Sequence, residues 1–204
     1  MYHVERVRRL ALHLADQEDL KGKVDLQLIE LAALCHDIGD RKYAEQESEN
    51  VYAFLARHKY PKAELVQRIV DHVGFRKELG WNDMQDEPET VRWRNECLEL
   101  HAVQDADKLD AIGAFGVMRC AAYSGAKSIA LHVPELDPMT NMTKEQYETQ
   151  TVNKTGCAVN HFHEKLFRLR SLMRTKRGRE MAEERDRFMR EFVARVEKEY
   201  EMQL

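Results

Sequence analysis

Apolar residues recur at helical spacing along almost the whole chain. Near its start, one face of an amphipathic helix is predicted because residues three or four apart share a side. This face is formed by Val4, Val7, Leu10, Ala11 and Leu14. Gly22 ends the first predicted helix, and the Asp25 side chain is placed to cap a second one. The second helix carries apolar residues from Leu26 to Leu34 and continues into His36 and Asp37.

The later segments show the same period, interrupted by turn residues. Polar stretches at 80–89 and 125–141 are expected to be loops, the first of them on the surface where it could act as a lid. No alternating strand pattern of useful length is present in the sequence. The pattern therefore predicts an all-α fold in a single domain, residues 1–204. Further helices are predicted at about 45–58, from Pro61 to 73, at 90–122, and as two segments within 144–204 that are separated near Gly178.

Composition narrows the class of protein without naming a function. The chain has 204 residues, of which 43% are hydrophobic and 33% charged, with a formal net charge of -4. This balance fits one globular domain and gives no basic excess for a nucleic-acid partner. No apolar run is long enough to span a bilayer and no signal-peptide pattern is present, so a cytoplasmic protein is expected. The cysteines are dispersed without a CxxC pair, which favours free thiols over disulfides or a zinc knot.

His36 and Asp37 form the first candidate functional element. They stand where an apolar helical run ends, directly before Ile38 and Gly39. Neighbouring residues on a helix point about 100° apart, so both side chains reach one point only at a helix end. Imidazole and carboxylate together suit a borderline divalent cation. An isolated His–Asp dipeptide is more often a helix-end hydrogen bond, so a metal site requires ligands from elsewhere in the chain.

His3 is a candidate partner from the first predicted helix. It lies one turn before Arg6 and Val7 and can therefore face the core side. A site so close to a chain end is unusual, because chain ends fray unless they are docked. Two explanations stay open. Either metal binding holds this end in place, or the natural protein has a preceding helix that this sequence lacks.

The segment 103–114 supplies a second candidate partner. Three aspartates and a lysine lie among apolar residues at helical spacing in this stretch. Charged groups in such a setting are costly unless they are paired or bind a metal. Asp107 is thus a candidate ligand, and Lys108 a candidate phosphate contact. Asp105 is interpreted as a cap or as a partner of a metal-bound histidine, and Asp110 as an intrahelical salt bridge or a similar outer group.

Taken in order, His3, His36-Asp37 and Asp107 resemble the H…HD…D pattern of the HD-domain metal-dependent phosphohydrolases. The local sequences HVERV, ALCHDIGD and VQDADKLDAIGA are most similar to a small bacterial-type subgroup that includes nucleoside triphosphate pyrophosphohydrolases. The resemblance extends through NHFHEKL at residues 160–166 and so covers nearly the whole chain. In the family the last ligand is the Asp of an A-D-x-L pattern, which corresponds to Asp107 rather than Asp105.

The resemblance implies helices that bring these four side chains to one divalent ion, within a core of about residues 1–125, on which C-terminal helices from about 144–204 pack. Mn is the expected ion, with Fe, Co, Ni, Mg and Zn as alternatives. The implied reaction is hydrolysis of phosphate esters or anhydrides, with nucleotides as the substrate class and pyrophosphohydrolysis of nucleoside triphosphates as the leading case. A monomer or homodimer is expected, acting on a small molecule rather than on nucleic acid.

Other residues near these motifs fit hydrolytic chemistry. Asp40, three residues after Asp37, is placed to orient or deprotonate a water held by the metal, or to protonate the leaving oxygen. Arg6, Lys42 and Lys108 can neutralise charge that grows on phosphoryl oxygens. His72 follows an apolar helix and either lines the pocket or is a satisfied helix-end histidine.

Other features of the sequence have a simpler explanation than a functional one. The basic run at 168–179 is followed at once by acidic residues and is better explained as a solvated mixed-charge face than as a nucleic-acid patch. His13, His58, His101 and His132 have no supporting context and are expected at the surface. Two alternative functions remain open: a 5′-nucleotidase-like phosphomonoesterase, and a non-catalytic module that senses a metal or nucleotide.

Overall fold

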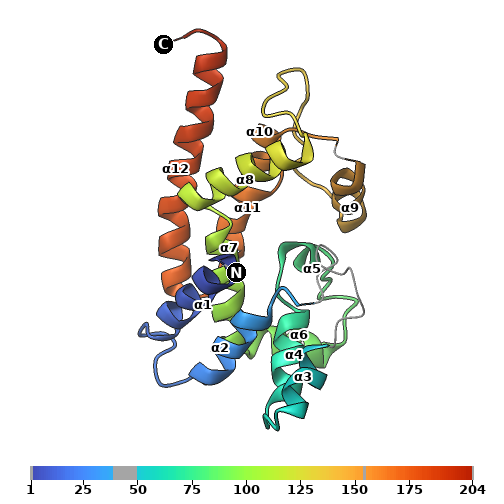
Figure 1. Ribbon diagram of the computed structural model, residues 1–204, viewed down its shortest axis with the longest axis vertical. Coiled ribbons are helices and arrows are strands. Elements are labelled where there is room, and N and C mark those ends of the chain that lie inside the picture. Colours follow the sequence, from blue (N-terminus) through green and yellow to red (C-terminus); the bar gives the residue numbers. More distant parts are fainter. Residues whose placement is uncertain (1, 39–49, 154, 204) are drawn as a thin grey trace. The chain divides into compact units, whose positions relative to one another are not determined.

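The computed structural model describes residues 2–38, 50–153 and 155–203, and Figure 1 shows that their regular structure is helical. No strand occurs within these ranges, so the predicted all-α class is confirmed. The chain forms two units, Met1–Asp107 and Lys108–Leu204. The single domain with C-terminal helices packed on its core stays a prediction.

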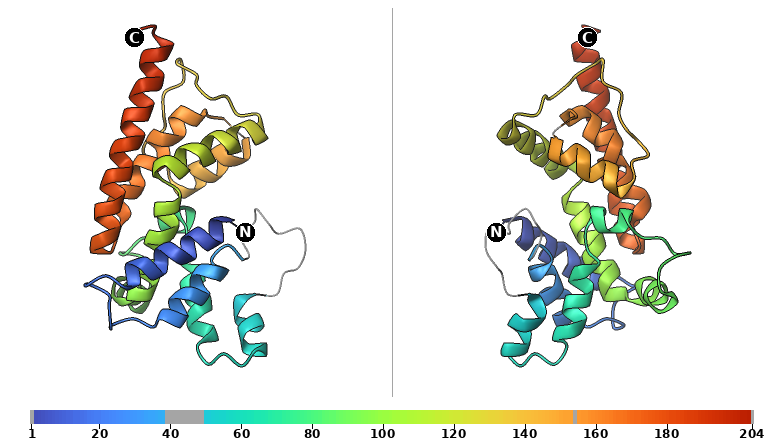
Figure 2. Two further views of the ribbon diagram at one scale, coloured as in Figure 1. Left: turned by 60° about the vertical axis from the view of Figure 1, so that its left-hand side comes forward. Right: turned by 90° about the vertical axis from the view of Figure 1, so that its right-hand side faces the viewer.

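The first unit begins with two antiparallel helices, α1 (Tyr2–Ala15) and α2 (Leu26–Cys35). They lie side by side in both views of Figure 2, at the blue end of the colour scale. Val7, Ala11 and Leu14 are buried on α1 at the spacing that the sequence predicts. The Asp25 carboxylate accepts hydrogen bonds from the backbone N–H groups of Gln27 and Leu28 at 3.0 and 3.1 Å. The predicted N-cap of the second helix is therefore confirmed.

Three further helices follow in this unit: α3 (Val51–Arg57), α4 (Ala63–Asp71) and the short α5 (Phe75–Leu79). α4 packs against both α2 and α3. Asn50 has extended backbone, and its side chain accepts a 2.7 Å hydrogen bond from the Ala53 N–H. This cap starts α3 at residue 51, and residues 45–49 of the helix predicted at about 45–58 lie outside the described residues.

The long helix predicted over 90–122 is wrong, because this stretch contains three helices. They are α6 (Pro88–Glu96), α7 (Leu98–Asp110) and α8 (Gly113–Lys127). Cys97 turns out of the helical region with ψ 97°. Gly113 has φ +72°, and a Cβ there would lie 2.8 Å from Cγ of Arg185. The apolar period runs through both breaks, so periodicity alone does not reveal them.

A buried arginine organises the acidic loop that precedes α6. Nη2 of Arg94 lies 2.9 Å from Asp83 and 2.8 Å from Asp86, and its guanidinium stacks over Trp81. The hydrogen bond from Arg94 is the main cause that lowers the pKa of Asp86. His101 is also buried, with Nε2 2.8 Å from the Arg94 carbonyl oxygen. The expectation that His101 lies at the surface is thus wrong, because this carbonyl gives it a buried partner.

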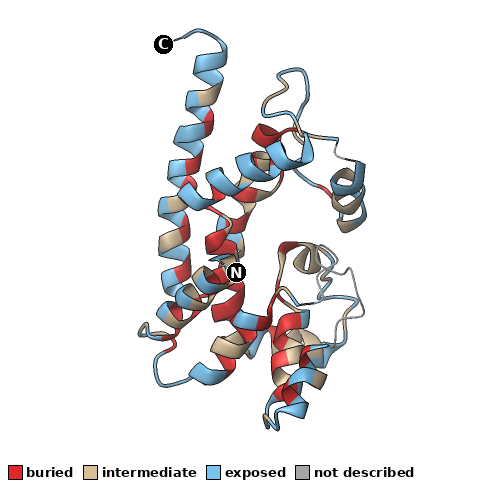
Figure 3. Cartoon of the chain, in the orientation of Figure 1, coloured by how far each residue is buried: buried red, intermediate tan, exposed pale blue. Residues whose placement is uncertain are grey.

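The second unit contains α8, α9 (Lys144–Asn153), a run of short helical segments, and the long α12 (Lys176–Tyr200). The break before α12 lies at Thr175, whose hydroxyl accepts a 3.0 Å hydrogen bond from the Gly178 N–H, and so slightly earlier than predicted. Figure 3 shows that exposed residues cover most of α12, with buried residues between them. The run consists of α10 (Ala158–His161), η1 (Phe162–Leu166), α11 (Phe167–Leu169) and η2 (Arg170–Leu172). The buried stripe of α12 is formed by Gly178, Ala182, Asp186, Met189 and Val193.

All four cysteines are free thiols, as predicted, although Cys97 and Cys120 are only half-buried. Among the described helices, none combines the length and apolar character that a bilayer crossing needs.

Replacement of Arg94 by Met should lower the free energy of unfolding by about 2 kcal/mol, since hydrogen bonds to charged groups contribute about 1.5–3 kcal/mol. Arg92→Met is the matched control on the same helix, because Arg92 is exposed and its loss should change stability by no more than about 0.5 kcal/mol. Urea denaturation at neutral pH measures both. Equal effects of the two variants would contradict the role given to Arg94.

Candidate metal centre

The four residues predicted as metal ligands come from three helices of the first unit. His3 lies in the first turn of α1, His36 and Asp37 follow the last residue of α2, and Asp107 lies in the last turn of α7. Helix ends and their flanks are where neighbouring residues can converge, because the side chains are no longer held to one regular spiral. The local structure therefore matches the expectation for the His–Asp pair.

The structure brings these four side chains together. Nε2 of His3 lies 3.2 Å from Nε2 of His36, 3.6 Å from Asp37 and 3.6 Å from Asp107. Nε2 of His36 lies 3.5 Å from Asp37 and 3.8 Å from Asp107. Donors bound at about 2.1 Å to one ion lie roughly 3.0–3.5 Å from their neighbours. Two imidazoles and two carboxylates at these separations fit a divalent cation of the borderline class.

The orientation of the His36 ring favours metal binding over a simple helix-end hydrogen bond. Its Nδ1 lies 2.7 Å from the carbonyl oxygen of Ala33. A protonated Nδ1 that donates to this carbonyl leaves the lone pair of Nε2 directed into the cluster. The opposing Nε2 of His3 is 3.2 Å away, and two such lone pairs require a proton or a cation beside them.

The four side chains of the cluster differ in how far they are buried. The His36 side chain is 2% exposed, whereas those of His3, Asp37 and Asp107 are 20–29% exposed. One side of the cluster is thus anchored in the protein, and the other is open to solvent. An open side leaves coordination positions for water and for a substrate oxygen, which distinguishes catalytic from structural metal sites.

The two neighbouring aspartates of α7 do not share the position of Asp107. Asp105 is fully buried, and two residues along a helix turn it about 200° away from Asp107. Asp110 forms an ion pair with Arg119 of α8. This partner lies on the next helix rather than on α7 itself, and the alternative of an outer group beside the metal ligands stays a prediction.

The predicted substrate contacts fall in different places. Arg6 lies one turn after His3 on α1 and is half-buried. Lys108 is the first residue of the second unit, where it is buried and its Nζ donates to the Leu172 carbonyl at 3.3 Å. Asp40 and Lys42 lie outside the described residues. A role in substrate binding or catalysis stays a prediction for all four.

His72 is the C-cap residue of α4. Its Nδ1 lies 2.7 Å from the Arg68 carbonyl oxygen, and its ring packs on Trp81 and Trp93 at centroid distances of 6.1 and 5.0 Å. Burial lowers the pKa of His72, which favours the neutral form of the ring. These contacts satisfy the helix-end interpretation, and substrate contact stays a prediction.

Gln104 is not among the residues predicted from the sequence, although it connects the end of α4 with α7, the helix that carries Asp107. Its Nε2 donates a 2.8 Å hydrogen bond to the His72 carbonyl, and it precedes Asp107 by one turn on α7. Gln104 is buried, and its Oε1 has no hydrogen-bond partner in the described part of the chain. An uncharged amide within the charged segment 103–114 was the available signal.

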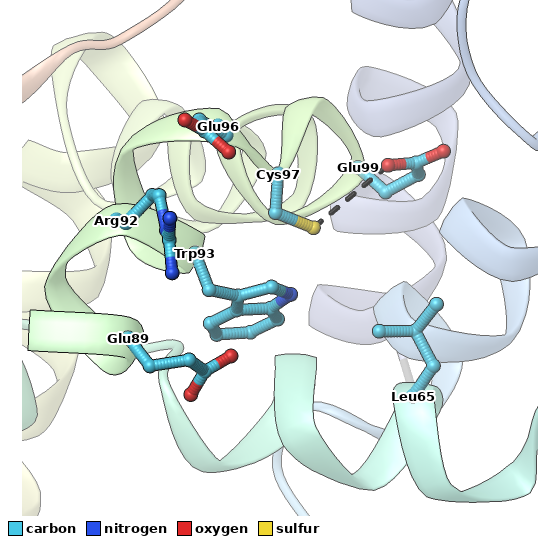
Figure 4. Close-up of a pocket in the computed structure, with 7 residues that line it drawn as sticks. All are labelled: Leu65, Glu89, Arg92, Trp93, Glu96, Cys97 and Glu99. Carbon is cyan, nitrogen blue, oxygen red and sulfur yellow. Dashed lines mark hydrogen bonds between the residues drawn. The ribbon is translucent and has the colours of Figure 1, made fainter.

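A separate cavity of about 350 Å³ lies in the first unit, and Figure 4 shows Trp93 among its lining residues, between Glu89 and Cys97. Glu89 pairs with Arg68 at 2.9 Å, and Glu99 accepts a 3.0 Å hydrogen bond from the Asp25 N–H. Glu99 precedes Asp107 by two turns of α7, about 12 Å along the helix axis. The cavity is therefore distinct from the His–Asp cluster. Its lining residues are Leu65, Glu89, Arg92, Trp93, Glu96, Cys97 and Glu99.

Cys97 in this cavity is not poised as a nucleophile. Burial raises the pKa of its thiol to about 11. The thiolate is the reactive form, so at neutral pH this cysteine stays protonated and inert.

Comparison with known proteins identifies similar chains over nearly the full length. YpgQ of Bacillus subtilis is 34% identical over 203 residues, covering 97% of this chain and 82% of the relative. Its crystal structure in complex with ADP matches with a TM-score of 0.69 and 30% identity, covering 97% of this chain and 87% of the other.

Two other crystal structures are comparably similar. A Lactobacillus plantarum protein has a TM-score of 0.75 and 35% identity, with 98% of this chain and 86% of the other covered. An HD-superfamily hydrolase from Bacillus thuringiensis has a TM-score of 0.67 and 29% identity, with coverages of 98% and 85%.

The family model of the HD domain matches residues 1–112. This segment is more than half of the chain and contains His3, His36, Asp37 and Asp107. The resemblance predicted from the sequence is confirmed: the chain belongs to the HD-domain family of hydrolases.

Proposed function

We propose that this protein is a metal-dependent phosphohydrolase that acts on nucleotides, with nucleoside triphosphate pyrophosphohydrolysis as its reaction. The observation that carries the proposal is the convergence of two imidazoles and two carboxylates. The two histidine Nε2 atoms lie 3.2 Å apart, and each lies 3.5–3.8 Å from both carboxylates. HD domains bind divalent metals, which supports the same assignment.

His3, His36, Asp37 and Asp107 would hold the ion, and Mn is the proposed metal among the borderline cations that this donor set accepts. When bound, such an ion polarises a phosphoryl oxygen and lowers the pKa of a coordinated water toward neutrality. The hydrogen bond from Nδ1 of His36 to the Ala33 carbonyl keeps that ring in the tautomer that can bind.

We assign the remaining steps to other residues of the chain. Asp40, three residues beyond Asp37 in the chain, would take a proton from the attacking water or give one to the leaving oxygen. Arg6 follows His3 by one turn of α1, and its cation would stabilise negative charge on a phosphoryl oxygen. Lys42, Lys108 and His72 are proposed as further substrate contacts.

Nucleotides are proposed as the substrate class for two reasons. The related YpgQ was crystallised with ADP. The open face of the cluster, formed by the 20–29% exposed side chains, is also accessible to a phosphate chain. The polyphosphate of a nucleoside triphosphate supplies the negatively charged oxygens that a divalent ion and an arginine bind well.

Product analysis tests the reaction. The protein is incubated with Mn²⁺ and a panel of nucleoside mono-, di- and triphosphates, and the products are separated by ion-exchange chromatography. Release of diphosphate together with a nucleoside monophosphate is expected. Inorganic phosphate as the primary product would instead indicate a phosphomonoesterase, and unchanged nucleotides throughout would indicate a binding module.

Asp107→Ala should weaken Mn²⁺ binding at least about 100-fold and abolish hydrolysis, because it removes a donor from the ion itself. Asp105→Asn is the matched control on the same helix, and should leave partial binding and activity, since partners of metal ligands typically contribute about 10–100-fold to affinity. Isothermal titration with Mn²⁺ measures both variants. Wild-type affinity in Asp107→Ala would remove Asp107 from the ligand set.

Asp40→Asn should lower kcat about 10²–10⁴-fold, the range typical for loss of a general acid or base. Mn²⁺ affinity should stay within about threefold of wild type, because Asp40 is not proposed as a ligand. Steady-state kinetics combined with Mn²⁺ titration separates the two effects. A parallel loss of metal binding would show that Asp40 supports the ion rather than the proton transfer.

A further inference from the structure

An ion pair between Arg8 and Glu30 links the antiparallel helices α1 and α2 part-way along their length. Counting five residues along α1 from His3 reaches Arg8, and counting six residues back along α2 from His36 reaches Glu30. With a rise of about 1.5 Å per residue, the ion pair lies about 7.5–9 Å from the two histidines along the helix axes. The ion pair Arg8–Glu30 and the histidine pair His3–His36 therefore require the same alignment of α1 on α2.

Arg8 is held closely in this position. Its Nε and Nη2 lie 2.6 and 2.5 Å from Oε1 of Glu30. Its third nitrogen, Nη1, lies 3.0 Å from Oε1 of Glu5, one turn earlier on α1. Both partners of the cross-helix pair are only about one-third exposed, at 31% and 35%. The guanidinium thus connects its own helix to α2 through directional contacts.

Apolar packing alone does not specify this alignment. The buried residues of α1 and α2 repeat every three or four positions, so a shift by one turn would again place apolar residues opposite apolar residues. A one-turn shift moves the helices by about 5.4 Å. The two Nε2 atoms are 3.2 Å apart, so such a shift would separate His3 from His36. An ion pair between directional groups distinguishes the two alignments because the shift breaks it.

His3 is the ligand that depends most on this alignment. Among the four predicted ligands it alone comes from α1, and it lies in the first turn, where a helix frays most easily. His36, Asp37 and Asp107 are delivered by α2 and α7 and do not need α1 to reach the cluster.

We propose that Arg8 and Glu30 are positioning residues that set the register of α1 on α2 and thereby keep His3 within reach of the metal ion bound by His36. This inference rests on the proposed metal site, and it assigns that site two residues outside the HD pattern. Neither touches the ion, and their effect on it passes through His3.

Mn²⁺ titration of Glu30→Gln tests this role. The expected result is about tenfold weaker binding, comparable to the loss of an outer partner of a metal ligand. Glu89→Gln is the matched control, because Glu89 pairs with Arg68 between two other helices of the same unit. Its Mn²⁺ affinity should stay within about twofold of wild type. Unchanged affinity in Glu30→Gln would overturn the proposal.

The variant Arg8→Met distinguishes the register mechanism from a direct effect of charge on Mn²⁺ binding. If Glu30 acted only through its charge, its removal would weaken cation binding, whereas removal of the Arg8 cation would strengthen it. The register mechanism instead predicts that Arg8→Met and Glu30→Gln both weaken Mn²⁺ binding. Opposite signs for the two variants would overturn it.

A His3→Ala background shows whether the effect passes through His3. There, adding Glu30→Gln should change Mn²⁺ affinity by less than about twofold, because the residue to be positioned is gone. A general loss of structure would lower affinity in both backgrounds, so full additivity would overturn the proposal. Circular dichroism without metal confirms that each variant is folded.

The same titrations distinguish this inference from the proposed function. Wild-type protein that binds Mn²⁺ but hydrolyses no nucleotide would refute the reaction and leave the register mechanism standing. Normal hydrolysis and Mn²⁺ binding in Glu30→Gln would refute the register mechanism alone. Failure of wild type to bind any divalent cation would refute both.

Discussion

The antiparallel contact of α1 with α2 is the constraint on which the candidate site depends. It places Nε2 of His3 3.2 Å from Nε2 of His36, and two carboxylates complete the group. Such an arrangement gathers lone pairs and negative charge at one point, which costs free energy unless a cation is present. The most economical explanation of the geometry is therefore that the fold maintains it for a metal ion. The open side of the cluster leaves positions on such an ion for water or another ligand.

Buried polar groups elsewhere in the first unit hold the elements around this site. Arg94 gathers the acidic loop onto α6, and Gln104 joins the end of α4 to α7 through the His72 carbonyl. α7 thereby carries both a structural amide and, one turn later, the carboxylate of Asp107. Arg94 and the side-chain nitrogen of Gln104 each bond a partner on another segment, which makes the positions of those segments interdependent.

Helix termini decide much of what differs between the predicted and observed folds. Asp25 was recognisable as a cap because its side chain acts on the next three residues, and the structure confirms it. The break at Cys97 and the turn at Gly113 were missed, since the apolar period runs through both. His101 is expected at the surface because the Arg94 carbonyl that contacts its ring becomes available through folding rather than through a local motif.

The sequence by itself determined the helical class, the HD family and the identity of the four candidate ligands. Residue type, spacing and local sequence motifs are sufficient for these three inferences because they can be read from the chain without its fold. Only the tertiary structure decided that His3, His36, Asp37 and Asp107 converge, that Asp110 pairs with Arg119, and which cavity lies apart from the cluster. The tertiary structure also decided that Arg8 pairs with Glu30, because only the antiparallel packing of α1 and α2 brings their opposite charges together. Convergence requires distances between residues many positions apart, and those distances are set by how helices pack rather than by any helix alone.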